Sequence, residues 1–179
     1  MGPIRFRQAG QDDADAIGAV HVAAWREAYG GILPQDFLDG LSVEARSAMW
    51  RSVLSDGLSG TSVFVAENGS GIVGFGACGA QRDEKLRDQG FDGEIGAIYV
   101  LQAQQRAGIG KSLMALMARS LLAADRRAAS LWVIRENAPA RTFYEGLRGT
   151  LLGEKIQELQ GATLIEVAYG WTDLASLAS

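Results

Sequence analysis

The spacing of hydrophobic and polar positions along the chain predicts strands and helices in a definite order. Apolar residues at every second position are typical of strands, and apolar residues three or four positions apart are typical of helices. The first spacing, together with short apolar runs, predicts strands at 4–7, 62–67, 71–78, 94–101, 130–134, 151–158 and 163–169. The second spacing predicts helices at 12–29, 43–54, 112–124 and 138–147.

Turn-forming residues separate these elements and mark two hairpins. Asn68-Gly69-Ser70-Gly71 joins the second and third strands, and Gln160-Gly161 joins the last two. Asp56-Gly57 ends the second helix, and the polar run 81–92 predicts a loop. The order β-α-α-β-β-β-α-β-α-β-β predicts a mixed α/β (α+β) fold rather than a doubly wound sheet. We expect about seven mostly antiparallel strands, flanked by four helices.

Composition narrows the class of protein. The chain has 179 residues, 47% of them hydrophobic, which suits one compact domain spanning 1–179. A single cysteine, Cys78, leaves no internal disulfide, and with no secretory signal in view we expect a cytoplasmic protein. The net charge of -4 and the lack of a long apolar run argue against nucleic-acid and membrane partners. The sequence contains no cluster of histidine and cysteine residues, so we expect no bound metal.

The stretch with the clearest chemistry is Gln105-Arg106-Ala107-Gly108-Ile109-Gly110-Lys111-Ser112, between the predicted strand 94–101 and the helix that follows. The first N–H groups of a helix lack intrahelical partners, and the helix dipole favours an anion there. Gly108 and Gly110 carry no Cβ, so a ligand could approach the main chain closely. The pattern therefore predicts a phosphate-binding turn.

Two familiar phosphate motifs fit this turn poorly. Gly110-Lys111-Ser112 resembles the end of a Walker A motif, but Gln105 stands at the first glycine position. The strand 130–134 ends in Arg135 and supplies no magnesium-binding Asp, which argues against an NTPase. The dinucleotide fingerprint fails at Leu113, where a third glycine belongs.

A third pattern accounts for the turn and for a second segment downstream. Gln-x-x-Gly-x-Gly from Gln105 is followed by Asn-x-x-Ala-x-x-x-Tyr from Asn137 to Tyr144. This pair resembles the GNAT acyltransferase superfamily, whose members use acetyl-coenzyme A, and the order of elements agrees along nearly the whole chain. The resemblance implies that the fourth and fifth strands splay apart and that the pantetheine arm of the cofactor lies between them.

The resemblance also implies a set of cofactor-binding residues. The pantetheine would pair with the backbone of Ile98, Tyr99 and Val100. Asn137 would hydrogen-bond the cofactor, and Tyr144 would lie near the thioester sulfur. The side chains of Arg106 and Lys111 would add positive charge near the pyrophosphate. The pyrophosphate itself would bind to the backbone amides of the glycine turn: Arg106, Ala107, Gly108, Ile109, Gly110 and Lys111.

Two residues are candidates for catalysis. Tyr144 could protonate the departing thiolate, because an ordinary phenol pKa near 10 keeps its proton at neutral pH; alternatively it only packs the core. Glu94 could act as a base through water, or be a solvated carboxylate at a strand end. Some relatives carry a carboxylate on the fifth strand, where this chain has Trp132. The sequence offers no suitable nucleophile for a covalent acetyl-enzyme intermediate. We therefore expect the amine to attack the thioester directly.

The sequence says least about the acceptor amine and the residues that bind it. Trp25 and Tyr29, one helical turn apart, could line an acceptor pocket or pack the core. We expect His21 to be a structural residue and Cys78 a core residue. The acceptor could be a small-molecule or a protein amine, and a homodimer is possible. A non-catalytic CoA-binding regulatory module is the alternative function.

Overall fold

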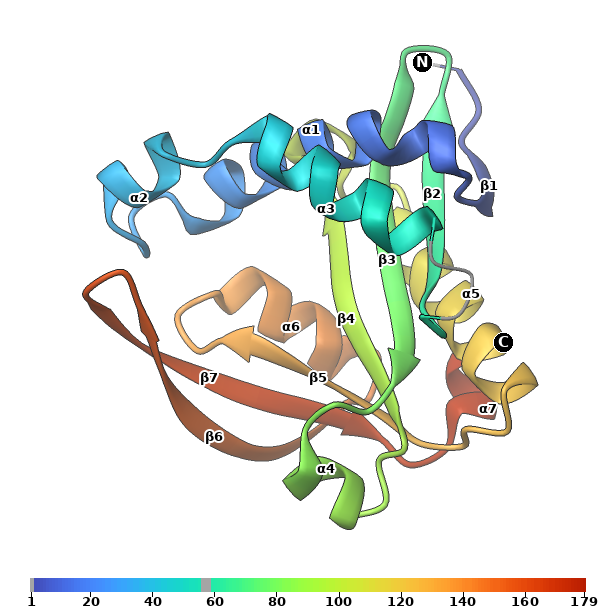
Figure 1. Cartoon of the computed structure of the whole chain (residues 1–179). Helices are drawn as coiled ribbons and strands as arrows, with labels where there is room; N and C mark the ends of the chain where they lie inside the picture. Colours follow the sequence, from blue (N-terminus) through green and yellow to red (C-terminus); the bar gives the residue numbers. More distant parts are fainter. Residues whose placement is uncertain (1, 56–58) are drawn as a thin grey trace.

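The computed structural model describes residues 2–55 and 59–179 (Figure 1). Within these residues, seven strands form one sheet in the order β1-β2-β3-β4-β5-β7-β6. Every neighbouring pair is antiparallel except β4 and β5, which are parallel. The strands are β1 Arg5–Gln8, β2 Ser62–Asn68, β3 Gly71–Ala80, β4 Gly93–Val100, β5 Ala129–Ile134, β6 Thr150–Leu159 and β7 Ala162–Trp171.

Helices cover both faces of this sheet. They are α1 Ala14–Tyr29, α2 Gln35–Asp39, α3 Val43–Ser55, α4 Glu84–Asp88, α5 Ile109–Ala123, α6 Ala138–Gly146 and α7 Leu174–Leu177. α1 and α3 lie side by side over β3 and β4, whereas α5 packs on the opposite face of β2, β3 and β4 (Figure 1). The mixed α/β fold and the long elements predicted from periodicity are therefore confirmed.

Three short helices were not predicted from the sequence. α2, α4 and α7 have only four or five residues each, so they show no hydrophobic period. The prediction of a loop at 81–92 was wrong at its centre, because the Asp83 side chain accepts a hydrogen bond from the amide of Leu86 and caps α4. Buried Leu86 anchors that turn. The predicted break at Asp56-Gly57 lies outside the described residues.

The two parallel strands separate soon after they begin. β4 and β5 pair only at Gly93 with Ala129 and at Glu94 with Ser130. Beyond Glu94 the strands diverge, as Figure 1 shows, so one side of the β4 backbone is left without a strand partner. The residues from Ala97 to Val100 are accordingly only half-buried, although β4 is a central strand. The predicted splaying of the fourth and fifth strands is confirmed.

A bulge interrupts β4 at this opening. Ala77 of β3 pairs with Ala97, but its neighbour Cys78 pairs with Ile95, so Gly96 is left over. Bulges of this kind re-aim side chains and are frequent beside active sites. Here the bulge allows both Ile95 and Ile98 to face the α5 core, while Ala97 faces the core under α1 and α3.

Close contact between α1 and α3 leads to a prediction about stability. A Cβ on Gly18 would lie 2.4 Å from Ser47 Oγ and 2.7 Å from its backbone nitrogen. Gly18→Ala must therefore push the two helices apart, and we expect urea unfolding to show a net loss of about 2 kcal/mol. Gly146→Ala is the control, because a Cβ there meets nothing within 4 Å. Equal stability of the two variants would contradict the close crossing.

Candidate functional site

The glycine turn presents a row of free amides to solvent. Gly108 adopts a left-handed conformation with φ of 78° and caps α5. The first bond of that helix joins the amide of Ser112 to the carbonyl of Gly108 at 3.0 Å. Among the described residues, none of the amides from 106 to 111 donates a hydrogen bond. A Cβ built on Gly108 meets no atom within 4 Å, so the space above these amides is open.

Two hydrogen bonds hold the turn in place. The Gln105 side chain donates to the Val100 carbonyl at 3.0 Å, and the Glu27 carboxylate accepts from the amide of Gln102 at 2.8 Å. These bonds tie the turn to the end of β4 and to α1. Gly110 has a packing role that was not predicted from the sequence. A Cβ at this position would lie 3.0 Å from the Phe143 ring of α6. Its missing side chain lets α5 and α6 pack closely.

Helix α6 carries Asn137 and Tyr144 to the other side of the opening. The Asn137 side chain accepts from the amide of Ala140 at 3.3 Å and caps the helix. The far side of α6 is fixed to β7, because the Tyr169 hydroxyl donates to Glu145 at 2.5 Å and accepts from Arg141 at 3.0 Å. Asn137 and Tyr144 are 8% and 7% exposed, so their positions are well determined by packing.

Three tyrosines converge where β4, α1 and α6 meet: Tyr29, Tyr99 and Tyr144. Burial raises the pKa of all three phenols. The Tyr99 phenol further raises the pKa of both Tyr29 and Tyr144, so all three share one environment. The Tyr29 hydroxyl lies near the Tyr99 hydroxyl and the Asn137 side chain, and the Tyr99 hydroxyl lies near the Trp25 indole. The Tyr144 hydroxyl has no such neighbour among the described residues, which suits a place that receives a ligand or water.

The predicted acceptor residues lie against this cluster. The Trp25 ring centroid is 4.9 Å from that of Tyr29 and 6.4 Å from that of Tyr99. Trp25 and Tyr29 also pack with Leu33, Leu38 and neighbours in a hydrophobic cluster that joins α1 and α2 to β5 and β7. The two residues therefore pack the core and adjoin the tyrosine cluster, and their role in an acceptor pocket stays a prediction.

His21 is a buried structural histidine, as the sequence indicated. Its ring stacks on Tyr99 with centroids 5.2 Å apart, and its Nδ1 accepts from the Trp50 indole N–H at 3.1 Å. Burial, and to a lesser degree the charge of Arg46, lowers the pKa of His21 from 6.5 to about 4. The imidazole is therefore neutral at pH 7 and contributes packing and an acceptor to the wall behind Tyr99. Cys78 is buried too, with its thiol pKa raised by burial.

The His21 environment predicts acid-sensitive stability. Between pH 6.5 and about 4, the unfolded chain binds a proton that the folded chain does not, so the free energy of unfolding falls as the pH falls. We expect this one group to account for a loss of about 3 kcal/mol between pH 7 and pH 4. Urea unfolding at several pH values measures the loss. His21→Asn keeps an acceptor for Trp50 but does not titrate, so its profile should be flatter; equal slopes would contradict the assignment.

Glu94 lies at the narrow end of the opening, beside the last β4–β5 pair. Its carboxylate accepts from Arg82 Nε and Nη2, each at 2.8 Å, and from the Arg82 amide at 3.2 Å. The side chain is 13% exposed, so Glu94 is an ion-paired carboxylate rather than a freely solvated one. On β5, the Trp132 ring is covered by Lys155 Nζ, 4.1 Å from the ring centroid.

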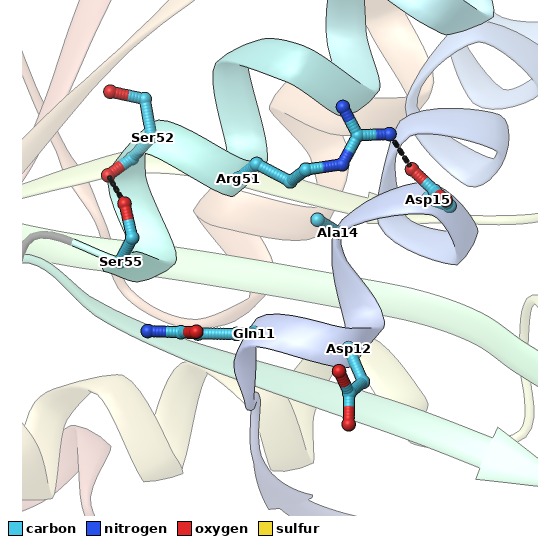
Figure 2. Close-up of a pocket in the computed structure, with 7 residues that line it drawn as sticks. All are labelled: Gln11, Asp12, Ala14, Asp15, Arg51, Ser52 and Ser55. Carbon is cyan, nitrogen blue, oxygen red and sulfur yellow. Dashed lines mark hydrogen bonds and ion pairs between the residues drawn. The ribbon is translucent and has the colours of Figure 1, made fainter.

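One cavity lies away from this opening. It holds about 460 Å³ between the start of α1 and the end of α3, lined by Gln11, Asp12, Ala14, Asp15, Arg51, Ser52 and Ser55 (Figure 2). Figure 2 shows Arg51 turned toward Asp15, with which it forms an ion pair. From Asp15 to Tyr29, α1 rises by about 20 Å, which separates this cavity from the tyrosine cluster.

A smaller cavity of about 250 Å³ lies at the other end of α3. It is lined by Phe37, Gly40, Leu41, Ser42, Ala45, Arg46 and Gln160. The Arg46 guanidinium carbon is 5.5 Å from the Trp25 ring centroid, so this cavity adjoins the predicted acceptor residues.

No group of three or more His, Cys, Asp or Glu side chains in residues 2–55 and 59–179 is arranged to hold a metal ion. In the same part of the chain, no helix has the length and apolar character required to cross a membrane.

Comparison with known proteins gives consistent matches. The model of the acetyltransferase (GNAT) domain family matches residues 59–147. The uncharacterized N-acetyltransferase YuaI of Bacillus subtilis is 37% identical over 175 residues, which cover 97% of this chain and 96% of YuaI.

Two solved structures share the fold at low sequence identity. The PaiA N-acetyltransferase of Thermoplasma acidophilum, in complex with coenzyme A, matches with a TM-score of 0.68 at 18% identity, covering 92% of this chain and 98% of that one. Salmonella typhimurium yncA, solved with its cofactor acetyl-CoA, matches with a TM-score of 0.69 at 17% identity, covering 96% and 94%.

Proposed function

Because the chain belongs to the GNAT acetyltransferase family, we propose that it transfers an acetyl group from acetyl-CoA to a primary amine by direct attack in a ternary complex. The observation that carries this proposal is the continuous path along the opened edge of β4. Free amides stand at one end of that path, an unpaired strand edge follows, and a cluster of phenols lies beside it.

The residues present suit acetyl-CoA. The amides of 106–111 would bind the pyrophosphate, and the exposed side chains of Arg106 and Lys111 would add positive charge. The β4 backbone at Ile98, Tyr99 and Val100 would pair with the pantetheine, with the Val100 carbonyl already accepting from Gln105. Asn137, whose Oδ1 caps α6, would offer its amide N–H groups to the cofactor.

Tyr144 would stabilise the leaving sulfur. As the amine nitrogen bonds to the acetyl carbon, the carbon–sulfur bond breaks and negative charge moves onto sulfur. A thiol has a pKa of about 8.5, and burial raises the pKa of Tyr144 above its ordinary 10. The phenol therefore keeps its proton at neutral pH. Complete transfer of that proton to the thiolate would be uphill, which favours donation of a strong hydrogen bond by Tyr144.

The amine must lose a proton, and the need for a base depends on the acceptor. Deprotonating a lysine-like amine at pH 7 costs about 4.6 kcal/mol, whereas an α-amine costs about 1 kcal/mol. Glu94 remains the proposed base, acting through water. Its ion pair with Arg82 would hold the carboxylate in one orientation.

A substitution at Glu94 tests this role. Glu94→Gln should lower kcat at pH 7 by about 10- to 100-fold for a lysine-like amine and much less for an α-amine. Arg82→Gln is the control, because it breaks the same ion pair and leaves the carboxylate. Initial rates against pH would report the difference. An equal loss with lysine-like and α-amine acceptors would remove Glu94 as the base.

The proposed function is tested by incubating the protein with acetyl-CoA and a panel of primary amines. Released thiol gives the rate, and mass spectrometry identifies the acetylated product. Amine-dependent thiol release supports the transferase. Tight CoA binding without release across a broad panel would favour a CoA-binding regulatory module instead.

A further inference from the structure

One arginine beside the acceptor residues lacks a counter-ion. Arg46 is half-buried on the first turn of α3, with its guanidinium over the Trp25 ring. Its one side-chain polar contact is a weak one, from Nη1 to the Met49 sulfur at 4.0 Å. No carboxylate in the described part of the chain forms an ion pair with it. A guanidinium without a carboxylate partner is available to pair with an anion from elsewhere.

The surroundings of Arg46 also favour a negative group. Arg46 lines the cavity of about 250 Å³, into which the N-terminal turn of α3 opens. The positive end of the helix dipole therefore adds to the guanidinium charge. Glu44, the carboxylate on the same turn, accepts instead from the Ser42 hydroxyl at 3.2 Å.

A second donor without a partner lies between this cavity and the tyrosine cluster. The Trp25 indole N–H is buried, and although the Tyr99 hydroxyl lies near it, no well-aligned hydrogen bond to it forms among the described residues. The Trp25 ring lies within 5.5 Å of the Arg46 guanidinium carbon and within 4.9 and 6.4 Å of the Tyr29 and Tyr99 ring centroids. A ligand that bears oxygen atoms and extends from the cavity toward Tyr99 would satisfy both donors.

We propose that the acceptor is a small primary amine that carries a carboxylate, and that Arg46 binds this carboxylate while the amine reaches the opened edge of β4. A carboxylate matches the planar donor fork of arginine. It also suits a cavity smaller than the 300 Å³ or more of a typical ligand site, in which Arg46 is the cationic lining residue. The inference rests on the proposed function and names the acceptor class for it.

The test compares acceptors that differ only in charge and length. The series is glycine, 3-aminopropanoate, 4-aminobutanoate and 6-aminohexanoate, each paired with its neutral primary amide. At the best length, the carboxylate should have a kcat/KM at least about tenfold higher than its amide. Arg46→Gln should lower kcat/KM for that carboxylate by about 10- to 100-fold, mainly through KM, and change the neutral amides little. Arg46→Lys should restore part of the loss.

A matched control lies on the same helix. Arg51→Gln removes an arginine that is paired with Asp15 at the other end of α3, so it should leave the carboxylate preference unchanged. Circular dichroism and the acetyl-CoA affinity establish that each variant is folded and binds the donor.

The outcomes separate the inference from the proposed function. If no amine is acetylated although acetyl-CoA binds, the proposed function fails and the inference fails with it. If amines are acetylated equally with and without a carboxylate, only the inference is overturned. The same holds if Arg46→Gln affects charged and neutral acceptors equally.

Discussion

Tyr144→Phe should lower the kcat of acetyl transfer by about 10- to 150-fold, which is the worth of one hydrogen bond to a developing charge, and leave acetyl-CoA affinity nearly unchanged. The reason is geometric as well as chemical. The Tyr144 ring packs against Tyr169 and Trp171, with centroids 6.0 and 6.2 Å away, and phenylalanine keeps that packing. Only the hydroxyl, which has no partner among the described residues, is lost.

Tyr169→Phe is the matched control for this experiment. That hydroxyl hydrogen-bonds Arg141 and Glu145 and so fixes α6 to β7. Its loss should lower the free energy of unfolding and have little effect on kcat. Thiol release at saturating acceptor measures kcat, and calorimetric titration with CoA measures donor affinity. If Tyr144→Phe turns over as fast as the wild type, Tyr144 has no part in the mechanism and is a core residue.

Gly108→Val should weaken CoA binding by about 100-fold, because it combines two effects. A branched residue is strained at a φ of 78°, and its side chain would occupy the open space above the free amides. Loss of one or two hydrogen bonds to a charged phosphate accounts for a change of this size. Titration with CoA gives the affinity, and titration with pantetheine, which lacks the pyrophosphate, should give the same value as the wild type.

Gly161→Val controls for backbone strain alone. Gly161 has a φ of 84° with no atom within 4 Å of a built Cβ, but it lies in the β6–β7 turn. Its substitution should lower the free energy of unfolding and leave the affinity for CoA unchanged. Normal CoA affinity in a folded Gly108→Val variant would overturn the assignment of the phosphate-binding turn.

The glycine turn and the helix cap proposed to bind the donor could be predicted from sequence because their signals are local. A strand, a glycine turn and a helix are consecutive, so Gln105 and Gly108 already imply where free amides stand. Likewise, Asn137 precedes α6 at a capping position, and its spacing to Tyr144 is about two helical turns. The prediction failed where elements were too short for a period to be seen, as in α4.

The acceptor side depends on contacts between distant segments, which no local pattern encodes. Arg46 approaches Trp25 only because α3 packs along α1. Tyr29, Tyr99 and Tyr144 come from three elements, and their shared environment follows from the divergence of β4 and β5. The ion pair of Glu94 with Arg82 also escaped notice, because Arg82 lies in a stretch that looked like a solvated loop.

The divergence of β4 and β5 has a consequence for folding stability and solubility. An unpaired strand edge is ordinarily a template for aggregation, yet here it lies within the sheet, between two strands that already have partners on their other sides. Another chain cannot dock there without forcing the molecule open, whereas a slender ligand can. Such a ligand completes the hydrogen bonding of the sheet, so CoA should act as a removable eighth strand. Its binding should slow amide exchange along β4 and raise the melting temperature progressively as the CoA concentration rises.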